Sequence, residues 1–248
     1  MPTENHPLIH LSEQVSDAVK TGERVAVIFD LDSTLFCVSP RTQAILRDLS
    51  AQPEFQRDHS ETAQALQTVA VRPTDWGIRT VLEREKVKGH PSVWVKIRDF
   101  WREHFFANHY LHHDLVYPGA IEYVQHLQGL GAEILYLTGR GQTSMREGTL
   151  KMLSQQGFPL VSPDHLIMKP SDVETDEAFK ALVLRDLVHQ YKPIWFFENE
   201  PVIIEHVRIH APSVNIVYVH SVNSGRKPPP TDLPMIETSY VAGLPPRG

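Results

Sequence analysis

Residues 25–34 read Val-Ala-Val-Ile-Phe-Asp-Leu-Asp-Ser-Thr, and this stretch decides the fold class of the chain. An apolar run that ends abruptly at Asp30 is typical of a buried parallel strand with a carboxylate at its carboxyl end. Further apolar runs end in polar residues in the same way: 134–137 before Thr138, 166–168 before Lys169, 194–197 before Glu198 and 216–219 before His220. We therefore predict five buried strands, each followed by polar side chains.

Helical periods separate these strands. Apolar residues with helical spacing occur before Gly131, before Gly157 and over residues 179–187, and glycine is common just past the end of a helix. Alternating strands and helices predict the α/β class, with a Rossmann-like open parallel sheet and helices on both of its faces. Such sheets bind ligands at the carboxyl ends of their strands. The polar residues of the predicted strands lie at those ends.

A long insertion interrupts the alternation after the first strand. Its apolar residues, among them Trp94, Ile97 and Trp101, keep helical spacing, so we predict a small α-helical cap. After about residue 221 the chain is rich in proline, and we expect a tail that is extended over the surface or disordered. The predicted units are an α/β core of residues 1–37 and 118–221, a cap of residues 38–117, and a C-terminal tail of residues 222–248.

Size and charge narrow the classes of function. A chain of 248 residues can form one sizeable core and a second small domain. The net charge of −6, from 30 acidic and 24 basic residues, would repel a polyanion, so nucleic acid is not an expected partner. The single Cys37 forms no internal disulfide, and the chain shows neither a secretory signal nor a span of about 18 apolar residues. We expect a cytoplasmic protein without membrane contact, and the sequence leaves the oligomeric state open.

Asp30 and Asp32 place two carboxylates two residues apart where the first strand ends. One carboxylate can attack phosphorus to give an aspartyl-phosphate, and a second one nearby can protonate the leaving oxygen and later deprotonate the hydrolytic water. We therefore predict Asp30 as the nucleophile and Asp32 as the general acid and base. The expected substrate is a small phosphorylated compound.

A phosphate ester brings negative charge to a site that already holds carboxylates, so this chemistry requires a cation. A hard cation with oxygen ligands, such as Mg²⁺, is the natural choice. We predict Asp30, Asp32 and Glu198 as its ligands, with the backbone carbonyl of Asp32 as a further possible donor and Glu200 as an open alternative. Magnesium commonly keeps several waters and few protein ligands.

The phosphoryl oxygens need hydrogen-bond donors and a positive charge. Thr138 and the following backbone amides, beginning with Gly139, can donate, and a lysine can supply the charge. Two lysines compete for this role, because Lys169 ends a predicted strand and Lys180 lies in the helix before the strand that ends at Glu198. Spacing alone leaves this choice open.

Taken together, these motifs resemble those of the haloacid dehalogenase-like hydrolase superfamily, whose phosphatases begin with an apolar strand into Asp-x-Asp-x-Thr. Residues 28–34 match that first motif, residues 135–140 resemble the second, and order and spacing agree over about residues 24–220. The resemblance implies that Lys180, which follows Phe179, is the lysine of the third motif. It also implies that the helical insertion closes over the site and selects the substrate.

The fourth motif departs from the family pattern. Family members usually carry a pair of aspartates there, whereas this chain has Glu198-Asn199-Glu200. Glutamate is one methylene longer than aspartate, so the metal geometry and the second acidic ligand at this position differ from the usual case. The departure also motivates an alternative in which the chain is a non-catalytic module that binds a phosphorylated ligand.

Two other reactions are alternatives to phosphate ester hydrolysis. A phosphotransferase or phosphomutase on the same scaffold would pass the phosphoryl group to an alcohol instead of water. A dehalogenase is disfavoured, because that chemistry has no use for Asp32 or a cation.

We interpret the histidines of residues 104–113 as part of the cap and not as a metal site, since no third ligand is evident. Cys37 has no activating partner in the sequence, so we do not expect it to be a nucleophile.

Overall fold

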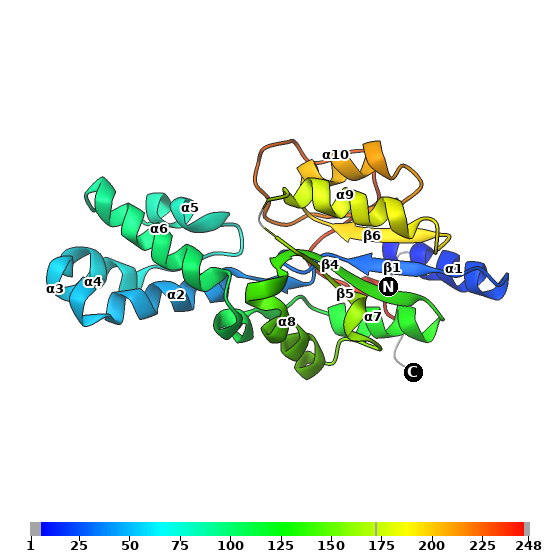
Figure 1. The fold of residues 1–248 in the computed structure, drawn as a ribbon, viewed down its shortest axis with the longest axis horizontal. Coiled ribbons are helices and arrows are strands. Elements are labelled where there is room, and N and C mark those ends of the chain that lie inside the picture. Colours follow the sequence, from blue (N-terminus) through cyan, green and yellow to red (C-terminus); the bar gives the residue numbers. More distant parts are fainter. Residues whose placement is uncertain (1–5, 172, 246–248) are drawn as a thin grey trace.

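The computed structural model describes residues 6–171 and 173–245. Its centre is a six-stranded sheet of order β5-β4-β1-β6-β7-β8, in which every neighbouring pair is parallel (Figure 1). The strands are β1 (Ala26–Phe29), β4 (Glu133–Gly141), β5 (Leu166–Lys169), β6 (Ile194–Glu198), β7 (Asn215–Val219) and β8 (Met235–Ile236). The predicted α/β class with an open parallel sheet is confirmed.

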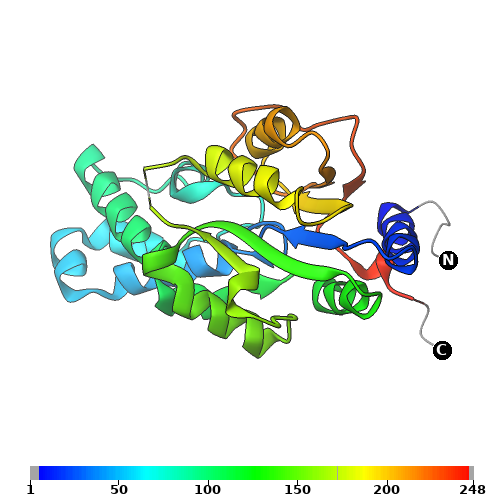
Figure 2. The ribbon, with the colours of Figure 1, turned by 45° about the vertical axis from the view of Figure 1, so that its right-hand side comes forward.

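Helices cover both faces of this sheet (Figure 2). One face packs against α1 (Pro7–Lys20), α7 (Ala120–Gly129) and α8 (Gln142–Gln156), and the other against α9 (Asp176–Leu187) and α10 (Pro201–His210). Strand β1 divides its side chains between the two: Val27 and Phe29 join the first apolar cluster, Ala26 and Ile28 the second. Burial on both faces explains why its sequence is apolar throughout and not alternating.

The helices end where the sequence predicts. Gly157 lies just after α8 with φ of +88°, and Gly131 follows α7 with φ of +99°. Glycine adopts these left-handed conformations without a steric penalty, which is why it ends helices so often. The longest helices have 15 residues. No helix within residues 6–171 and 173–245 is long and apolar enough to cross a lipid bilayer.

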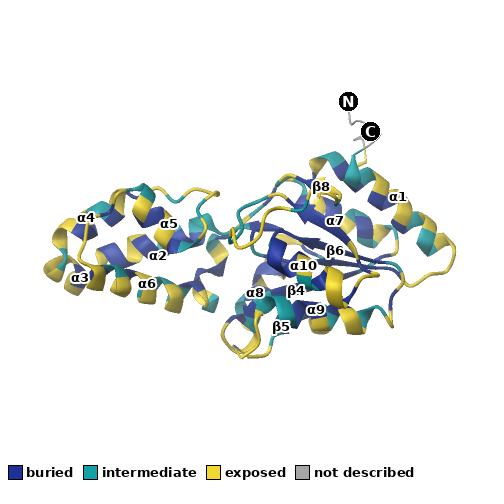
Figure 3. Ribbon diagram, turned by 90° about the horizontal axis from the view of Figure 1, so that it is seen from above, coloured by how far each residue is buried: buried dark blue, intermediate teal, exposed yellow. Residues whose placement is uncertain are grey.

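The segment between β1 and α7 folds around an apolar core of its own (Figure 3). Side chains such as Leu46, Leu66, Val81 and Ile97 form this core, separate from the two clusters on the sheet. A short antiparallel ribbon, β2 (Phe36–Cys37) with β3 (Leu115–Val116), joins the segment to the sheet. The helices are α2 (Ser39–Ala51), α3 (Pro53–Asp58), α4 (Ser60–Thr68), α5 (Gly77–Arg84), α6 (Pro91–Phe105) and the 3₁₀ helix η1 (Asn108–His113).

Residues 222–234 run without helix or strand and are largely exposed, whereas parts of residues 235–245 pack against the core, which we did not expect of a tail. Strand β8 extends the sheet beside β7, and Tyr240 is fully buried. The Tyr240 hydroxyl donates a hydrogen bond to the carbonyl of Thr34 over 2.9 Å, and its backbone N–H donates to Pro118 over 2.8 Å. A Cβ atom on Gly119 would lie 2.7 Å from the backbone nitrogen of Val241. The C-terminal segment therefore packs directly beneath the loop that follows β1.

The described residues include two further 3₁₀ helices, η2 (Pro163–His165) before β5 and η3 (Val241–Gly243) after β8. Helix α1 and η3 lie at the end of the core that faces away from α2 to α6 (Figure 2). The carboxyl ends of the strands face the helices of the insertion, so any ligand at those ends meets both parts of the molecule.

Candidate active site

The residues predicted for the site lie together at the carboxyl edge of the sheet. Asp30 directly follows β1, Thr138 lies in β4, and Glu198 ends β6. All three line a cavity of about 690 Å³, together with Asp32, Gly139 and Lys180. The neighbouring strands β4, β1 and β6 bring side chains from three distant parts of the sequence to one place.

Lys180 connects two of the predicted acidic residues. Its side chain is 2% exposed, and its Nζ donates to Asp30 Oδ1 over 2.6 Å and to Glu198 Oε2 over 2.8 Å. Helix α9 presents this lysine from its second turn, after an N-cap in which Thr175 Oγ1 accepts from the Ala178 N–H. Burial lowers the pKa of Lys180, but the two carboxylates outweigh that effect and raise it above its ordinary value. The lysine is therefore charged.

Lys169, the competing lysine, has a different partner. Its Nζ pairs with Asp176 Oδ1 over 2.6 Å in the first turn of α9, and it contacts neither Asp30 nor Glu198 through a hydrogen bond or ion pair that the structure records. The geometry thus favours Lys180 for the position beside the predicted nucleophile.

Burial shapes the acidity of the two carboxyl groups that Lys180 bridges. Loss of solvent raises the pKa of Asp30 above its ordinary value, with the charge of Lys180 acting in the opposite direction. The same burial, opposed by Lys180 and reinforced by Asp30, raises the pKa of Glu198 to about 7. The positive charge of Lys180 therefore allows two buried acidic groups to lie close together.

Asp32 belongs to a second, adjacent cluster that sequence reasoning missed. Its Oδ1 accepts from Arg41 Nη2 over 2.9 Å and from Arg140 Nε over 3.2 Å. Both arginines also bind the buried Asp114, through Arg41 Nε over 2.8 Å and Arg140 Nη2 over 3.0 Å. Burial alone would raise the pKa of Asp32, but Arg140 and Arg41 hold that pKa well below its usual range.

This cluster joins the helical insertion to the sheet. Arg41 comes from α2, Asp114 from the end of the insertion, and Arg140 from β4. No local signal announces the pairing, because Arg41 and Asp114 lie 73 residues apart. Arg140 is the exception: it directly follows Thr138 and Gly139 in the sequence, so it could have been predicted as a site residue.

The predicted metal ligands are not all brought together. Asp30 and Glu198 converge on Lys180, whereas the Asp32 carboxylate turns to the arginines. Glu200 accepts hydrogen bonds from the backbone and hydroxyl of Ser224, which directs it to the C-terminal segment. Within residues 6–171 and 173–245, no three His, Cys, Asp or Glu side chains are arranged to bind a metal ion.

The oxygen donors nevertheless fit a hard cation in part. Asp30 and Glu198 are buried carboxylates that share one lysine, so a cation beside them would offset their remaining charge. Glu198 Oε1 is already held by the backbone N–H groups of Asn199 and Glu200, both at 2.9 Å, which orients the group. The Asp32 side chain does not fit, because two guanidinium groups already occupy it.

Thr138 is almost fully buried, and its Oγ1 accepts a hydrogen bond from the Arg140 N–H over 3.2 Å. Its hydroxyl proton is left for another acceptor. Gly139 packs so closely on Asp176 that a Cβ would lie 2.7 Å from the Asp176 Cγ. Together these contacts hold the backbone after Thr138 in one position at the cavity wall.

The histidines near η1 contact one another and neighbouring groups of the insertion. His104 stacks on Phe100 with ring centroids 3.9 Å apart and binds its carbonyl, and His112 Nδ1 lies 2.6 Å from the His109 carbonyl. Cys37 Sγ lies 3.1 Å from Ser39 Oγ. The structure records no contact between these groups and the carboxylates of the site.

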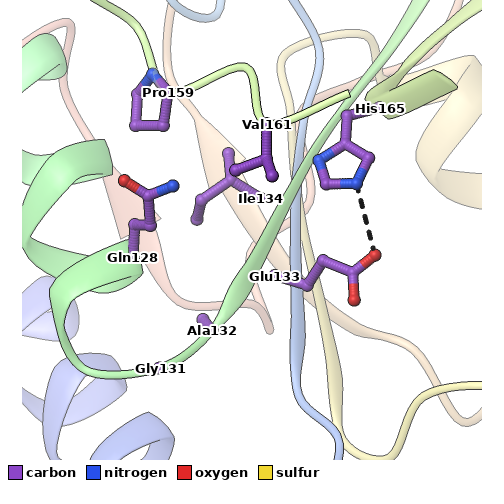
Figure 4. A pocket seen from close by; sticks show the side chains of 8 residues that line it. All are labelled: Gln128, Gly131, Ala132, Glu133, Ile134, Pro159, Val161 and His165. Carbon is purple, nitrogen blue, oxygen red and sulfur yellow. Dashed lines mark ion pairs between the residues drawn. The ribbon is translucent and has the colours of Figure 1, made fainter. Parts of the chain in front are cut away.

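A second cavity of about 340 Å³ lies near the amino ends of strands β4 and β5 (Figure 4). It is lined by Glu133, the first residue of β4, and by His165, whose Nε2 lies 3.5 Å from Glu133 Oε1. Glu133 also accepts from Arg24 over 3.0 Å. None of the predicted catalytic residues lines this cavity.

The fold and the site together define an α/β protein with buried carboxylates and a buried lysine at the carboxyl ends of a parallel sheet. The model of the haloacid dehalogenase-like hydrolase family matches residues 25–202, which is more than half of the chain. The chain therefore belongs to the haloacid dehalogenase-like hydrolase family. The resemblance that the sequence motifs indicated is confirmed.

Solved structures with this fold are distant in sequence. A candidate phosphatase from Clostridium difficile gives a TM-score of 0.52 at 16% identity, over 87% of this chain and 94% of that one. Protein tyrosine kinase A of Mycobacterium tuberculosis gives a TM-score of 0.52 at 14% identity, over 86% and 93%. Such low identities show a shared fold alone. No curated protein matches the chain significantly.

Proposed function

We propose that this protein is a phosphatase that hydrolyses a small phosphate monoester through an aspartyl-phosphate on Asp30. The observation that carries the proposal is Lys180, whose Nζ bridges Asp30 and Glu198 at the carboxyl edge of the sheet. A buried lysine beside a buried carboxylate lets a dianionic phosphoryl group approach that carboxylate. Family membership makes the chain a hydrolase, and the pair of aspartates suits phosphorus as the electrophile.

In the first step, a carboxylate oxygen of Asp30 bonds to phosphorus and the bond from phosphorus to the ester oxygen breaks. The leaving alkoxide takes a proton from Asp32. In the second step, water attacks phosphorus, gives a proton to Asp32 and releases inorganic phosphate with a free Asp30. Lys180, the Thr138 hydroxyl and the backbone after it hold the phosphoryl oxygens in both steps.

The general-acid role requires a protonated Asp32, whereas the two arginines favour its ionised form. Arg140 lines the same cavity, so an incoming phosphate dianion offers it an alternative partner. The pKa of Asp32 rises when a guanidinium group leaves it, because the attraction that favoured the charged form is lost. Substrate binding thus prepares the acid in this proposal.

Asp30 and Glu198, with the backbone carbonyl of Asp32, would hold a divalent cation, for which we propose Mg²⁺. The cation supplies positive charge that offsets the negative charge of the phosphoryl group. The longer side chain of Glu198 is oriented by two backbone N–H groups, which compensates for its extra rotatable bond.

We further propose that residues 38–117 act as a cap over this site, with residues 1–37 and 118–221 as the catalytic core. The cavity supports this division, because its lining comes from both parts. A cap excludes water and selects the leaving group.

Release of phosphate from a generic aryl phosphate, with Mg²⁺ or with EDTA, tests the proposal in wild type and Asp30→Asn. Asp186→Asn, an exposed change on α9, is the matched control. We expect metal-dependent turnover that Asp30→Asn abolishes and the control retains, together with a phosphoryl adduct on Asp30 by mass spectrometry. Turnover that survives Asp30→Asn would rule out the aspartyl-phosphate. Phosphate transfer to an added alcohol in preference to water would identify a phosphotransferase instead.

A further inference from the structure

The cavity is much larger than a phosphoryl group requires. Its volume is about 690 Å³. One water molecule in the liquid occupies about 30 Å³, so the cavity can hold a phosphoryl group, which is the size of a few waters, together with a much larger leaving group. From the carboxylates it extends to the helices of the insertion, where α5 and α6 supply its far wall. We name this far wall the cap wall, and its six side chains that matter here are Trp76, Arg79, Arg98, Trp101, Arg102 and Phe106.

Three of these side chains are aromatic and incompletely covered. Trp76 is 55% exposed and Phe106 is 44% exposed. Trp101 is fixed by a hydrogen bond from its Nε1 to Thr42 Oγ1 over 3.1 Å, and its ring lies 6.3 Å from that of Phe106. Exposed aromatic rings that gather on a cavity wall are typical of surfaces that bind a flat apolar group.

The other three side chains are arginines, and none is neutralised by a buried partner. Arg79 pairs with Glu83 over 2.7 Å and Arg98 with Asp99 over 2.6 Å. Both pairs are largely exposed, so they are weak and easily exchanged. Within the described part of the chain, Arg102 makes no ion pair.

The cap wall therefore carries arginines as well as aromatic rings, and among the described residues no ion pair engages Arg102. Asp75 is the one carboxylate that the insertion contributes to the described cavity lining, and Arg84 neutralises it over 2.6 Å in a nearly buried pair. The remaining acidic lining residues belong to the sheet side of the cavity, where the phosphoryl group would bind. Among the lining residues, the insertion thus contributes more cations than carboxylates, whereas the sheet side contributes more carboxylates than cations.

We propose that the cap wall binds the leaving group, and that the preferred substrates are phosphate monoesters whose alcohol carries an aromatic ring and a second anionic group. The ring stacks on Trp76, Trp101 or Phe106, and the anion pairs with Arg102 and its neighbours. Arginine also stacks on aromatic planes, so both groups can recognise one ligand together. This inference rests on the proposed phosphatase activity and adds the chemical class of its substrate.

Three esters distinguish the contribution of the aromatic ring from that of the second anionic group: 4-carboxybenzyl, benzyl and cyclohexylmethyl phosphate. Their alcohols have similar acidity, so differences in kcat/KM report recognition and not leaving-group reactivity. We expect kcat/KM to fall in that order, by about fivefold at each step, because a partly exposed charge pair and an aromatic contact each contribute modestly. Equal values for the three esters would overturn the proposal.

Two variants assign the contributions to side chains. Arg102→Gln is expected to narrow the gap between the carboxybenzyl and benzyl esters, and Trp76→Ala the gap between the benzyl and cyclohexylmethyl esters. Arg57→Gln and Val95→Ala change exposed residues of the insertion that do not line the cavity, and they serve as matched controls. Ratios that stay at the wild-type values in both test variants would contradict the assignment.

Binding of the same esters to the Asp30→Asn variant, followed by tryptophan fluorescence, keeps the two proposals separate. If no ester is hydrolysed by the wild type, the proposed phosphatase activity fails, but the order of binding affinities still tests the cap wall. The expected order is carboxybenzyl, then benzyl, then cyclohexylmethyl phosphate. Absence of binding, or binding without this order, refutes the substrate class.

Discussion

Replacement of Lys180 by methionine tests the central contact of the site. Methionine matches the aliphatic part of the lysine side chain but lacks the ammonium group that bridges Asp30 and Glu198. Lys180 is 2% exposed but lines the cavity, so in the variant water can solvate the two carboxylates only from the cavity side. Removing one member of a buried ion pair leaves the others uncompensated, which typically costs about 3–5 kcal/mol. We expect the free energy of unfolding to fall by that amount near pH 8.

The loss of stability in Lys180→Met should be larger at high pH than at low pH. The pKa of Glu198 is raised from 4.5 to about 7 in the folded protein, so the folded state binds more protons than the unfolded state between these values. Stability from this group is fully present below pH 4.5 and is lost as pH rises through about 7, by about 3 kcal/mol in total. Without Lys180 the pKa values of Glu198 and Asp30 rise further. The variant should therefore be least impaired near pH 5 and most impaired near pH 8.

Urea unfolding in EDTA, at pH 5 and at pH 8, measures both effects without a contribution from divalent cations. Lys169→Met is the matched control, because Lys169 forms a single ion pair with Asp176, whose side chain is 44% exposed. Such a pair contributes at most about 1 kcal/mol. An equal loss for Lys180→Met at both pH values would refute the reasoning, as would a control that is impaired to the same degree.

Three further predictions concern stability and are tested by the same unfolding assay. Arg41→Gln should cost about 3 kcal/mol, because it leaves buried carboxylates without one of their two cations, whereas the exposed Arg47→Gln should stay within about 0.5 kcal/mol. Tyr240→Phe should cost about 1 kcal/mol through its lost buried hydrogen bond, and no change would show that this bond is dispensable. Gly119→Ala should cost more than Gly22→Ala: both have left-handed φ, but only the first would meet backbone at 2.7 Å.

Much of the sheet could be predicted from the sequence, because its strands are buried on both faces. The apolar run of β1 and the runs that become β4, β5, β6 and β7 carry their own signal. Strand β8 does not, since it has two residues, Met235 and Ile236, and exists only because β7 offers an open edge. Helix α1 was not predicted either, although Leu8, Leu11 and Val15 keep helical spacing after Pro7.

The site residues also divide into those that the sequence predicts and those that it does not. Asp30, Thr138 and Glu198 could be found because each follows a run of apolar residues, and a parallel sheet brings the carboxyl ends of such runs together. The partners of Asp32 could not be found, because Arg41 and Arg140 reach it from different parts of the fold. Their positions depend on how the insertion packs on the sheet, and no local pattern encodes that packing.

The contact between Tyr240 and the carbonyl of Thr34 has a consequence for biosynthesis. The ribosome makes the nucleophile and its loop early, but it makes the residues that support this loop from below near the end of the described chain. The loop therefore cannot make this contact until the chain has been synthesised through Tyr240. A stop codon just before Tyr240 would leave every proposed catalytic side chain in the polypeptide and remove the support beneath the loop that carries the first two.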